Sequence, residues 1–119
     1  MGKKLDKTNI LLENIINVIK DAKGKNIISL DLRKIESAIC KHFIICTGTS
    51  NTHVNSIENK IIKTISKELG EKPRHTEGNN IREWILMDYY DIIVHVFQEK
   101  TREFYNIEDF WGDAKFTNY

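Results

Sequence analysis

The sequence predicts a single α/β domain in which a mixed five-stranded β-sheet is flanked by α-helices. Its 119 residues suit one domain by the usual prior of about 100 to 200 residues each. Segments with apolar residues at helical spacing alternate with short runs rich in Ile, Val and aromatic residues, which are typical of strands. The clearest runs lie in residues 82–97, where two apolar stretches broken by Asp88-Tyr-Tyr-Asp91 predict a β-hairpin. We expect a folded core over about residues 8–111 and a flexible tail over residues 112–119.

A first helix is predicted over about residues 8–23, followed by two strands. Asp6 or Thr8 can cap the start of this helix. The strands are predicted over residues 26–32 and 42–47, which are rich in Ile, Leu and Phe. The helix is predicted because its apolar residues recur three and four positions apart: Leu11, Leu12, Ile15, Ile16, Ile19 and Ala22.

A second helix is predicted to begin after Ser50, which is a good N-cap, and to end before Gly70. Residues 71–80 contain the only proline and a Glu-Gly-Asn-Asn turn signal. They therefore predict a loop with room for one short edge strand. The hairpin comes next, and a short helix is predicted over about residues 100–106.

The two runs of the hairpin carry different patterns. Residues 92–97 are nearly all apolar, which predicts a central strand covered on both faces. The first run alternates, so Trp84 and Leu86 share one face with Arg82 and Asp88 at its ends. An apolar centre with a charged rim suits a protein contact, in which Trp and Arg often dominate binding. A helix of the same chain could equally cover this face, and the residues alone leave both interpretations open.

Composition limits the expected partners. The formal net charge is +1, so no basic field indicates DNA binding, and any rRNA contact is expected to be peripheral. No apolar run approaches the ~20 residues of a membrane span, and residues 1–6 lack the apolar core of a signal peptide. We therefore expect a cytoplasmic protein that does not enter the membrane. Cys40 and Cys46 suit reduced thiols, and the sequence has neither CxxC nor Cys/His zinc spacing.

The most enzyme-like feature is the turn at Gly48–Ser50, because a turn entering a helix offers free backbone N–H groups to an anion. This turn contains a single glycine and matches neither a G-x-G-x-x-G motif nor a P-loop. A nucleotidyltransferase-like enzyme would also need paired carboxylates for a divalent metal, for which Asp88 and Asp91 are the candidates. His95 is expected to be a hydrogen-bonded core histidine rather than a base. We therefore expect no catalytic residue, cofactor or metal, and keep a nucleotide-binding enzyme as the alternative.

Three parts of the chain match a known family in the right order and together cover nearly the whole sequence. They are a strand-turn-helix segment, a hairpin segment and a closing segment: Phe43–Asn51; Glu77-Gly78 with Trp84–Asp88 and Asp91–Phe97; and Arg102–Ala114. Together they resemble the ribosomal silencing factor family, also called RsfS or Iojap.

The resemblance implies an α/β fold like that of nucleotidyltransferases without their catalytic carboxylates, often as a homodimer. It also implies binding to the fourteenth protein of the large ribosomal subunit, at the subunit interface. Occupying that surface would block joining of the small subunit and silence translation when nutrients are scarce. The family's contact tryptophan falls on Trp84, which favours an exposed binding face. Leu86, Asp88 and Tyr89 are the next candidates, on position alone.

Two positions depart from the family pattern. Lys41 stands where relatives usually have Asp, and Tyr90 stands where they usually have Gly in the hairpin turn. Because a bulky residue at positive φ is strained, we expect this turn to be of a different type or bulged.

Overall fold

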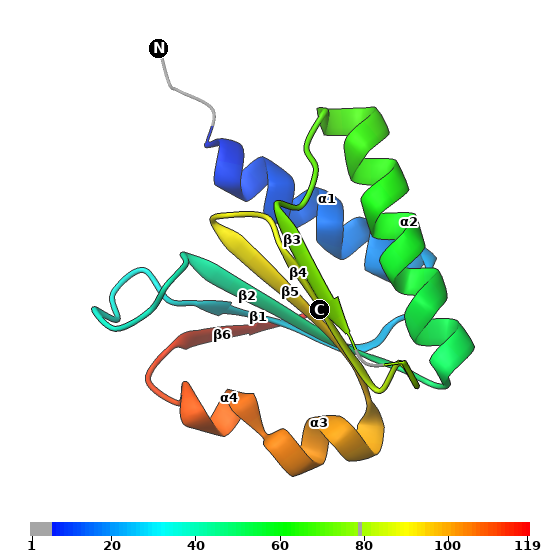
Figure 1. Cartoon of the computed structure of the whole chain (residues 1–119). Coiled ribbons are helices and arrows are strands. Elements are labelled where there is room, and N and C mark those ends of the chain that lie inside the picture. Colours follow the sequence, from blue (N-terminus) through cyan, green and yellow to red (C-terminus); the bar gives the residue numbers. More distant parts are fainter. Residues whose placement is uncertain (1–5, 79) are drawn as a thin grey trace.

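The computed structural model describes residues 6–78 and 80–119 (Figure 1). Residues 1–5, which belong to the segment expected to lack a signal peptide, and Asn79 of the predicted turn lie outside the described residues. Every predicted helix and strand is present, with ends within about two residues of expectation. The elements follow in the order α1 (Lys7–Asp21), β1 (Lys25–Asp31), β2 (His42–Gly48), α2 (Asn51–Leu69), β3 (His75–Gly78), β4 (Trp84–Asp88), β5 (Ile92–Gln98), α3 (Glu99–Tyr105), α4 (Ile107–Phe110) and β6 (Lys115–Asn118).

The strands form one mixed sheet of six strands in the order β3-β4-β5-β2-β1-β6. Among the described pairs, β2 and β5 run parallel and the others run antiparallel. The prediction of five strands is wrong by one, because residues 115–118 of the tail form β6. This strand pairs with the outer edge of β1 and so satisfies backbone groups that an edge strand leaves unpaired. The hydroxyl groups of Ser29 and Tyr119 also lie 2.9 Å apart.

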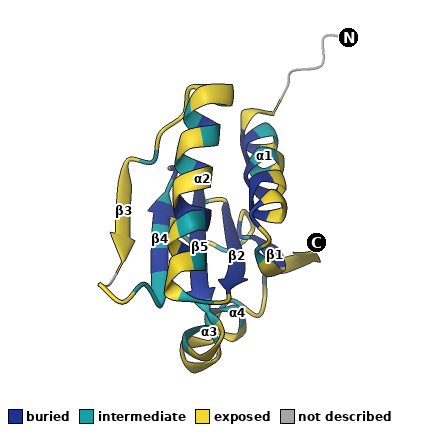
Figure 2. Cartoon of the chain, turned by 90° about the vertical axis from the view of Figure 1, so that its right-hand side faces the viewer, coloured by how far each residue is buried: buried dark blue, intermediate teal, exposed yellow. Residues whose placement is uncertain are grey.

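Helices cover both faces of the sheet, with α1 and α2 on one face and α3 and α4 on the other (Figure 1). The prediction of a central strand is confirmed, because β5 lies between β4 and β2 and residues 92–97 are buried throughout (Figure 2). No helix within the described residues is long and apolar enough to cross a membrane. The larger core lies under α1 and α2 and includes Ile15, Ile19, Ile57, Ile61, Ile85, Met87 and Val94, all at 0% exposure.

The two long helices have the predicted caps. The Asp6 carboxylate accepts a hydrogen bond from the Thr8 N–H at 3.0 Å at the start of α1. The Ser50 hydroxyl accepts one from the His53 N–H at 3.0 Å at the start of α2. Gly70 ends α2 with φ +67°, in the left-handed region that glycine adopts without strain.

The turn between β4 and β5 contradicts one expectation. Tyr90 does not avoid the left-handed region but has φ +73°, a conformation that destabilises a non-glycine residue by roughly 1–2 kcal/mol. Contacts within the turn offset this strain. The Tyr90 N–H donates to Asp88 Oδ1 at 2.8 Å, and the Arg74 guanidinium lies 4.8 Å above the Tyr90 ring. Arg74 Nε also donates to Asp88 Oδ2 at 3.0 Å, which links the three side chains.

Candidate protein-binding surface

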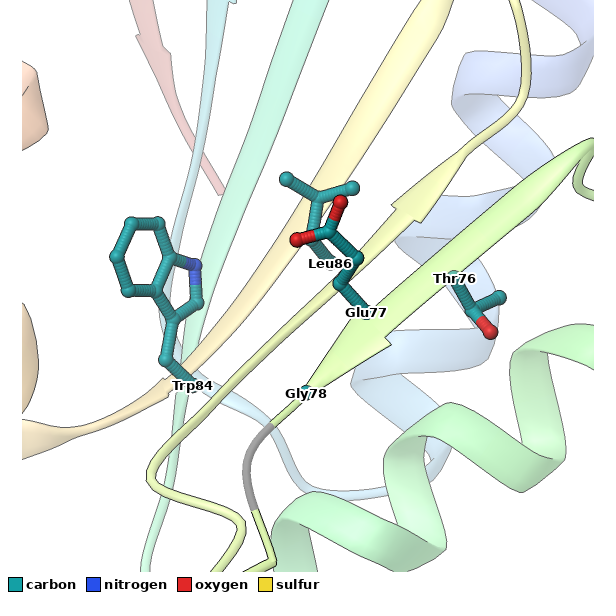
Figure 3. Close-up of a pocket in the computed structure, with 5 residues that line it drawn as sticks. All are labelled: Thr76, Glu77, Gly78, Trp84 and Leu86. Carbon is teal, nitrogen blue, oxygen red and sulfur yellow. The ribbon is translucent and has the colours of Figure 1, made fainter.

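A surface hollow of about 540 Å³ lies over the first two strands of the sheet, on the face away from α1 and α2 (Figure 3). Its lining comes from Trp84 and Leu86 on β4 and from Thr76 and Glu77 on β3. The Glu77 side chain lies on the same side as Trp84 and Leu86, whereas the Thr76 side chain points to the opposite side (Figure 3). Gly78 completes the lining. The hollow therefore joins the predicted contact residues to an edge strand.

Strand register explains why these residues meet. β3 runs antiparallel to β4, so that Glu77 lies opposite Leu86. Along β4 the side chains alternate, and Ile85 and Met87 point into the larger core with 0% exposure. Trp84 and Leu86 therefore take the other face, on the same side as Glu77 in Figure 3.

Gly78 lets the strand next to the hollow approach its neighbour closely. A Cβ atom at this position would lie 2.6 Å from Ile85 Cγ2 and 2.7 Å from Arg82 Nη1. Both distances are far shorter than van der Waals contact. Any larger residue would therefore have to displace the side chain of Ile85, which is packed in the larger core.

The Trp84 ring is partly buried, and its own chain holds it on several sides. It stacks on Phe97 with ring centroids 4.8 Å apart and contacts the Tyr105 ring of α3 at 4.7 Å. Its indole Nε1 donates a hydrogen bond to His95 Nδ1 at 3.2 Å. Helix α3 thus covers part of the ring, as one of the two interpretations expects, while the ring still lines the hollow.

His95 is the buried, hydrogen-bonded histidine that the sequence predicts. Its exposed fraction is 4%, and its ring meets the edge of Phe43 at 4.6 Å between centroids. Burial lowers the pKa of His95 to about 3, because the charged imidazolium would lose its hydration. The imidazole is therefore neutral at physiological pH.

The other two candidate contact residues lie elsewhere. Asp88 is at the far end of β4, about 13 Å along the strand from Trp84, and its carboxylate is occupied by Arg74 and the Tyr90 N–H. Tyr89 faces the larger core with 3% exposure, and burial raises the pKa of its hydroxyl to about 12. Trp84 and Leu86 are thus the predicted residues that the structure brings together.

The sequence indicates that its aromatic-rich C-terminal segment should add to the contact surface, and two of that segment's residues, on α3, lie beside Trp84. Tyr105 is 52% exposed beside Trp84, and its neighbour Phe104 is 80% exposed, with ring centroids 5.0 Å apart. These rings extend the aromatic surface from the hollow along the helix. Two adjacent aromatics in a short helix were the available signal, but their proximity to β4 depends on the tertiary fold.

The alternative nucleotide site is not assembled. Asp91 lies beside the start of β2, where its carbonyl accepts from the His42 N–H at 3.0 Å. Gly48 is at the other end of this strand, about 20 Å away. The Asp91 carboxylate also accepts from the Thr8 hydroxyl at 2.9 Å and lies 3.6 Å from Lys41 Nζ. In the part of the chain that the structure describes, no group of three or more His, Cys, Asp or Glu residues could hold a metal.

The helix start at Ser50 is also occupied by its own chain. The Thr49 N–H donates to His53 Nδ1 at 2.9 Å, and the His53 N–H donates to the Ser50 hydroxyl. The His53 N–H is one of the first-turn backbone groups that an anion would bind at a helix N-terminus. The turn is thus built as a capped helix start.

The structure is thus a mixed α/β domain with a partly exposed aromatic surface on β4 and α3, next to the edge strand β3. A family model described as "Ribosomal silencing factor during starvation" matches residues 5–118. The chain belongs to the ribosomal silencing factor (RsfS) family, which confirms the resemblance seen in the sequence. Members of this family are named for regulating the ribosome rather than for an enzymatic reaction.

Individual relatives agree with this assignment. Ribosomal silencing factor RsfS of Halalkalibacterium halodurans is 36% identical over 104 residues, which cover 87% of this chain and 87% of the relative. Ribosomal silencing factor RsfS of Chromobacterium violaceum is 38% identical over 100 residues, covering 84% and 80%. The crystal structure of protein CV0518 from Chromobacterium violaceum gives a TM-score of 0.83 at 34% identity, covering 90% of this chain and 88% of that one.

Proposed function

We propose that this protein silences ribosomes by binding the large subunit and sterically blocking the small subunit. The proposed partner is the fourteenth protein of the large subunit, at the subunit interface, and the proposed occasion is nutrient limitation. Family membership supports the general activity, since the family is described as acting on ribosomes during starvation. The observation that carries the proposed site is the Trp84 ring, which lines an open hollow although the chain holds it in place.

The chemistry of the hollow supports a protein partner. Trp84 and Leu86 form an apolar centre, and Glu77 supplies a polar border. This combination is typical of an interface in which one buried aromatic residue supplies most of the binding energy. We propose that a partner side chain enters the hollow and packs against the indole.

The proposed interface extends beyond the hollow. A specific protein interface buries about 800 Å² on each partner, more than two strand residues can supply. Tyr105 and Phe104 offer exposed aromatic area directly beside Trp84. The proposed binding face therefore comprises β3, β4 and the end of α3.

The proposed mechanism needs no chemical step. A bound protein domain excludes the small subunit as long as it stays in place, so inhibition should follow occupancy and require one factor for each large subunit. Action in the cytoplasm and homodimerisation of the free protein belong to the same proposal. Sedimentation velocity of the purified protein tests the dimer.

The substitution Trp84→Ala tests the site. It removes the indole that a partner would cover, and hot-spot aromatics typically contribute at least 2 kcal/mol, so binding to purified large subunits should weaken at least about thirtyfold. Co-sedimentation in a sucrose gradient measures this binding, and circular dichroism checks that the variant is folded. Phe116→Ala is the matched control, because Phe116 is a partly exposed aromatic on β6, at the opposite edge of the sheet. Equal co-sedimentation of the Trp84→Ala variant and the wild type would refute the proposed site.

A further inference from the structure

His95 holds the indole that carries the proposed binding face. The residue sits on β5 opposite Leu86, diagonally across the strand pair from Trp84. Its Nδ1 accepts the hydrogen bond from the Trp84 Nε1–H at 3.2 Å. Because His95 is only 4% exposed, this bond is shielded from competing water.

The hydrogen bond defines the state of the imidazole. A nitrogen that accepts carries no proton, so the neutral ring of His95 bears its proton on Nε2. That second nitrogen is buried and has no hydrogen-bond partner within the described residues. An unpaired buried donor destabilises a fold. The imidazole is therefore an unfavourable choice for stability alone.

Packing does not explain the choice of histidine. The His95 ring contacts the edge of Phe43 at 4.6 Å and lies nearly parallel to Phe97 at 6.0 Å. An apolar side chain such as leucine could fill this space without burying an unpaired N–H group. What the imidazole supplies beyond an apolar side chain is an acceptor for the indole of Trp84.

The acceptor determines which edge of the indole faces His95 on β5. Stacking on Phe97 and contact with Tyr105 restrict the plane of the Trp84 ring, but they do not distinguish its two edges. The hydrogen bond does so by drawing the nitrogen edge inward. Figure 3 shows the nitrogen on the side of Leu86 and the six-membered ring pointing away.

We propose that His95 is a positioning residue of the binding face, whose Nδ1 fixes the orientation of the Trp84 side chain that lines the hollow. This inference rests on the proposed function of that face. A side chain that is already fixed loses less conformational entropy on binding. His95 thereby contributes to affinity without touching the partner.

The test compares two substitutions that differ in hydrogen bonding. His95→Leu removes the acceptor, and His95→Asn keeps an acceptor oxygen near the position of Nδ1. We expect His95→Leu to weaken binding to purified large subunits about fivefold, the effect of one lost hydrogen bond, and His95→Asn to restore most of it. In ¹⁵N NMR spectra the Trp84 indole N–H resonance should move in the leucine variant and return toward its original position in the asparagine variant.

A second pair of measurements separates positioning from a general effect on folding. In a Trp84→Phe background no indole N–H remains, so adding His95→Leu should cause no further loss of binding. In the wild type, ¹⁵N shifts of His95 should show the proton on Nε2. Full binding by the His95→Leu variant, an equal loss in the Trp84→Phe background, or the proton on Nδ1 would each overturn the inference.

These outcomes are distinct from failure of the proposed function. If Trp84→Ala leaves large-subunit binding intact, the binding face itself is wrong. If Trp84→Ala abolishes binding while His95→Leu binds like the wild type, the face stands and the positioning role of His95 falls.

Discussion

Lowering the pH should destabilise this protein through His95. Its pKa in the fold is about 3, against 6.5 for a free imidazole. Below pH 6.5 the unfolded chain takes up a proton on this residue, and the folded chain does not until about pH 3. The stability associated with a neutral His95 is therefore fully present above pH 6.5 and declines as the pH falls through that window.

The size of the effect follows from the width of the window. Each pH unit within it removes about 1.4 kcal/mol of unfolding free energy, so a fall to pH 5 should remove about 2 kcal/mol. His42, which is 5% exposed and has a pKa also lowered by burial, acts in the same direction. For a domain of this size, 2 kcal/mol is a large part of a total stability of roughly 5–15 kcal/mol.

Urea denaturation at pH 7, 6 and 5 measures this dependence. The wild type should lose more stability than the His95→Leu variant, by about 2 kcal/mol at pH 5. His95→Asn should flatten the pH dependence to the same extent, because neither replacement titrates in this range. If the pH dependence is the same with and without His95, the residue is not held neutral by the fold and the reasoning fails.

Three further outcomes are expected. Tyr90→Gly should raise the unfolding free energy by about 1 kcal/mol in urea denaturation, because glycine adopts φ +73° without strain; a lower stability would show that the contacts to Arg74 outweigh the strain. Arg102→Ala should lower the unfolding free energy by about 2–3 kcal/mol, because its side chain is only 11% exposed, pairs with Glu108 and donates to the Asn26 carbonyl. Arg33→Ala is the control, because Arg33 belongs to an exposed ion pair, and it should leave thermal unfolding unchanged. Isothermal calorimetry with nucleoside triphosphates and Mg²⁺ should show no binding, and a measurable heat of binding would revive the nucleotide-binding alternative.

Local patterns were sufficient to predict most of the fold. Apolar spacing and capping residues such as Ser50 and Gly70 indicate each long helix and its ends, because these signals are written within the segment itself. β6 was missed for the opposite reason. Its four residues carry little strand signal, and they form a strand because β1 offers an unpaired edge.

In the candidate site, too, features set by the local sequence were predictable and contacts between elements were not. Alternation along β4 correctly paired Trp84 with Leu86, since side-chain parity is a local property. The contact of the Tyr105 ring with Trp84 and the hydrogen bond to His95 could not be predicted, because each joins residues of different elements. The strained Tyr90 shows a local rule overridden by its neighbours, the side chains of Asp88 and Arg74.

The alternation of β4 also sets the mechanical character of the proposed face. Ile85 and Met87 anchor the strand in the larger core, so the outward-facing Trp84 and Leu86 are held by a rigid strand rather than by a loop. Such a surface is preformed. A partner must fit its existing shape, and no segment of the surface has to fold before binding. Recognition of this kind should be quick to form, with association rates in the ordinary range of about 10⁵–10⁷ M⁻¹s⁻¹, and should be intolerant of misfit.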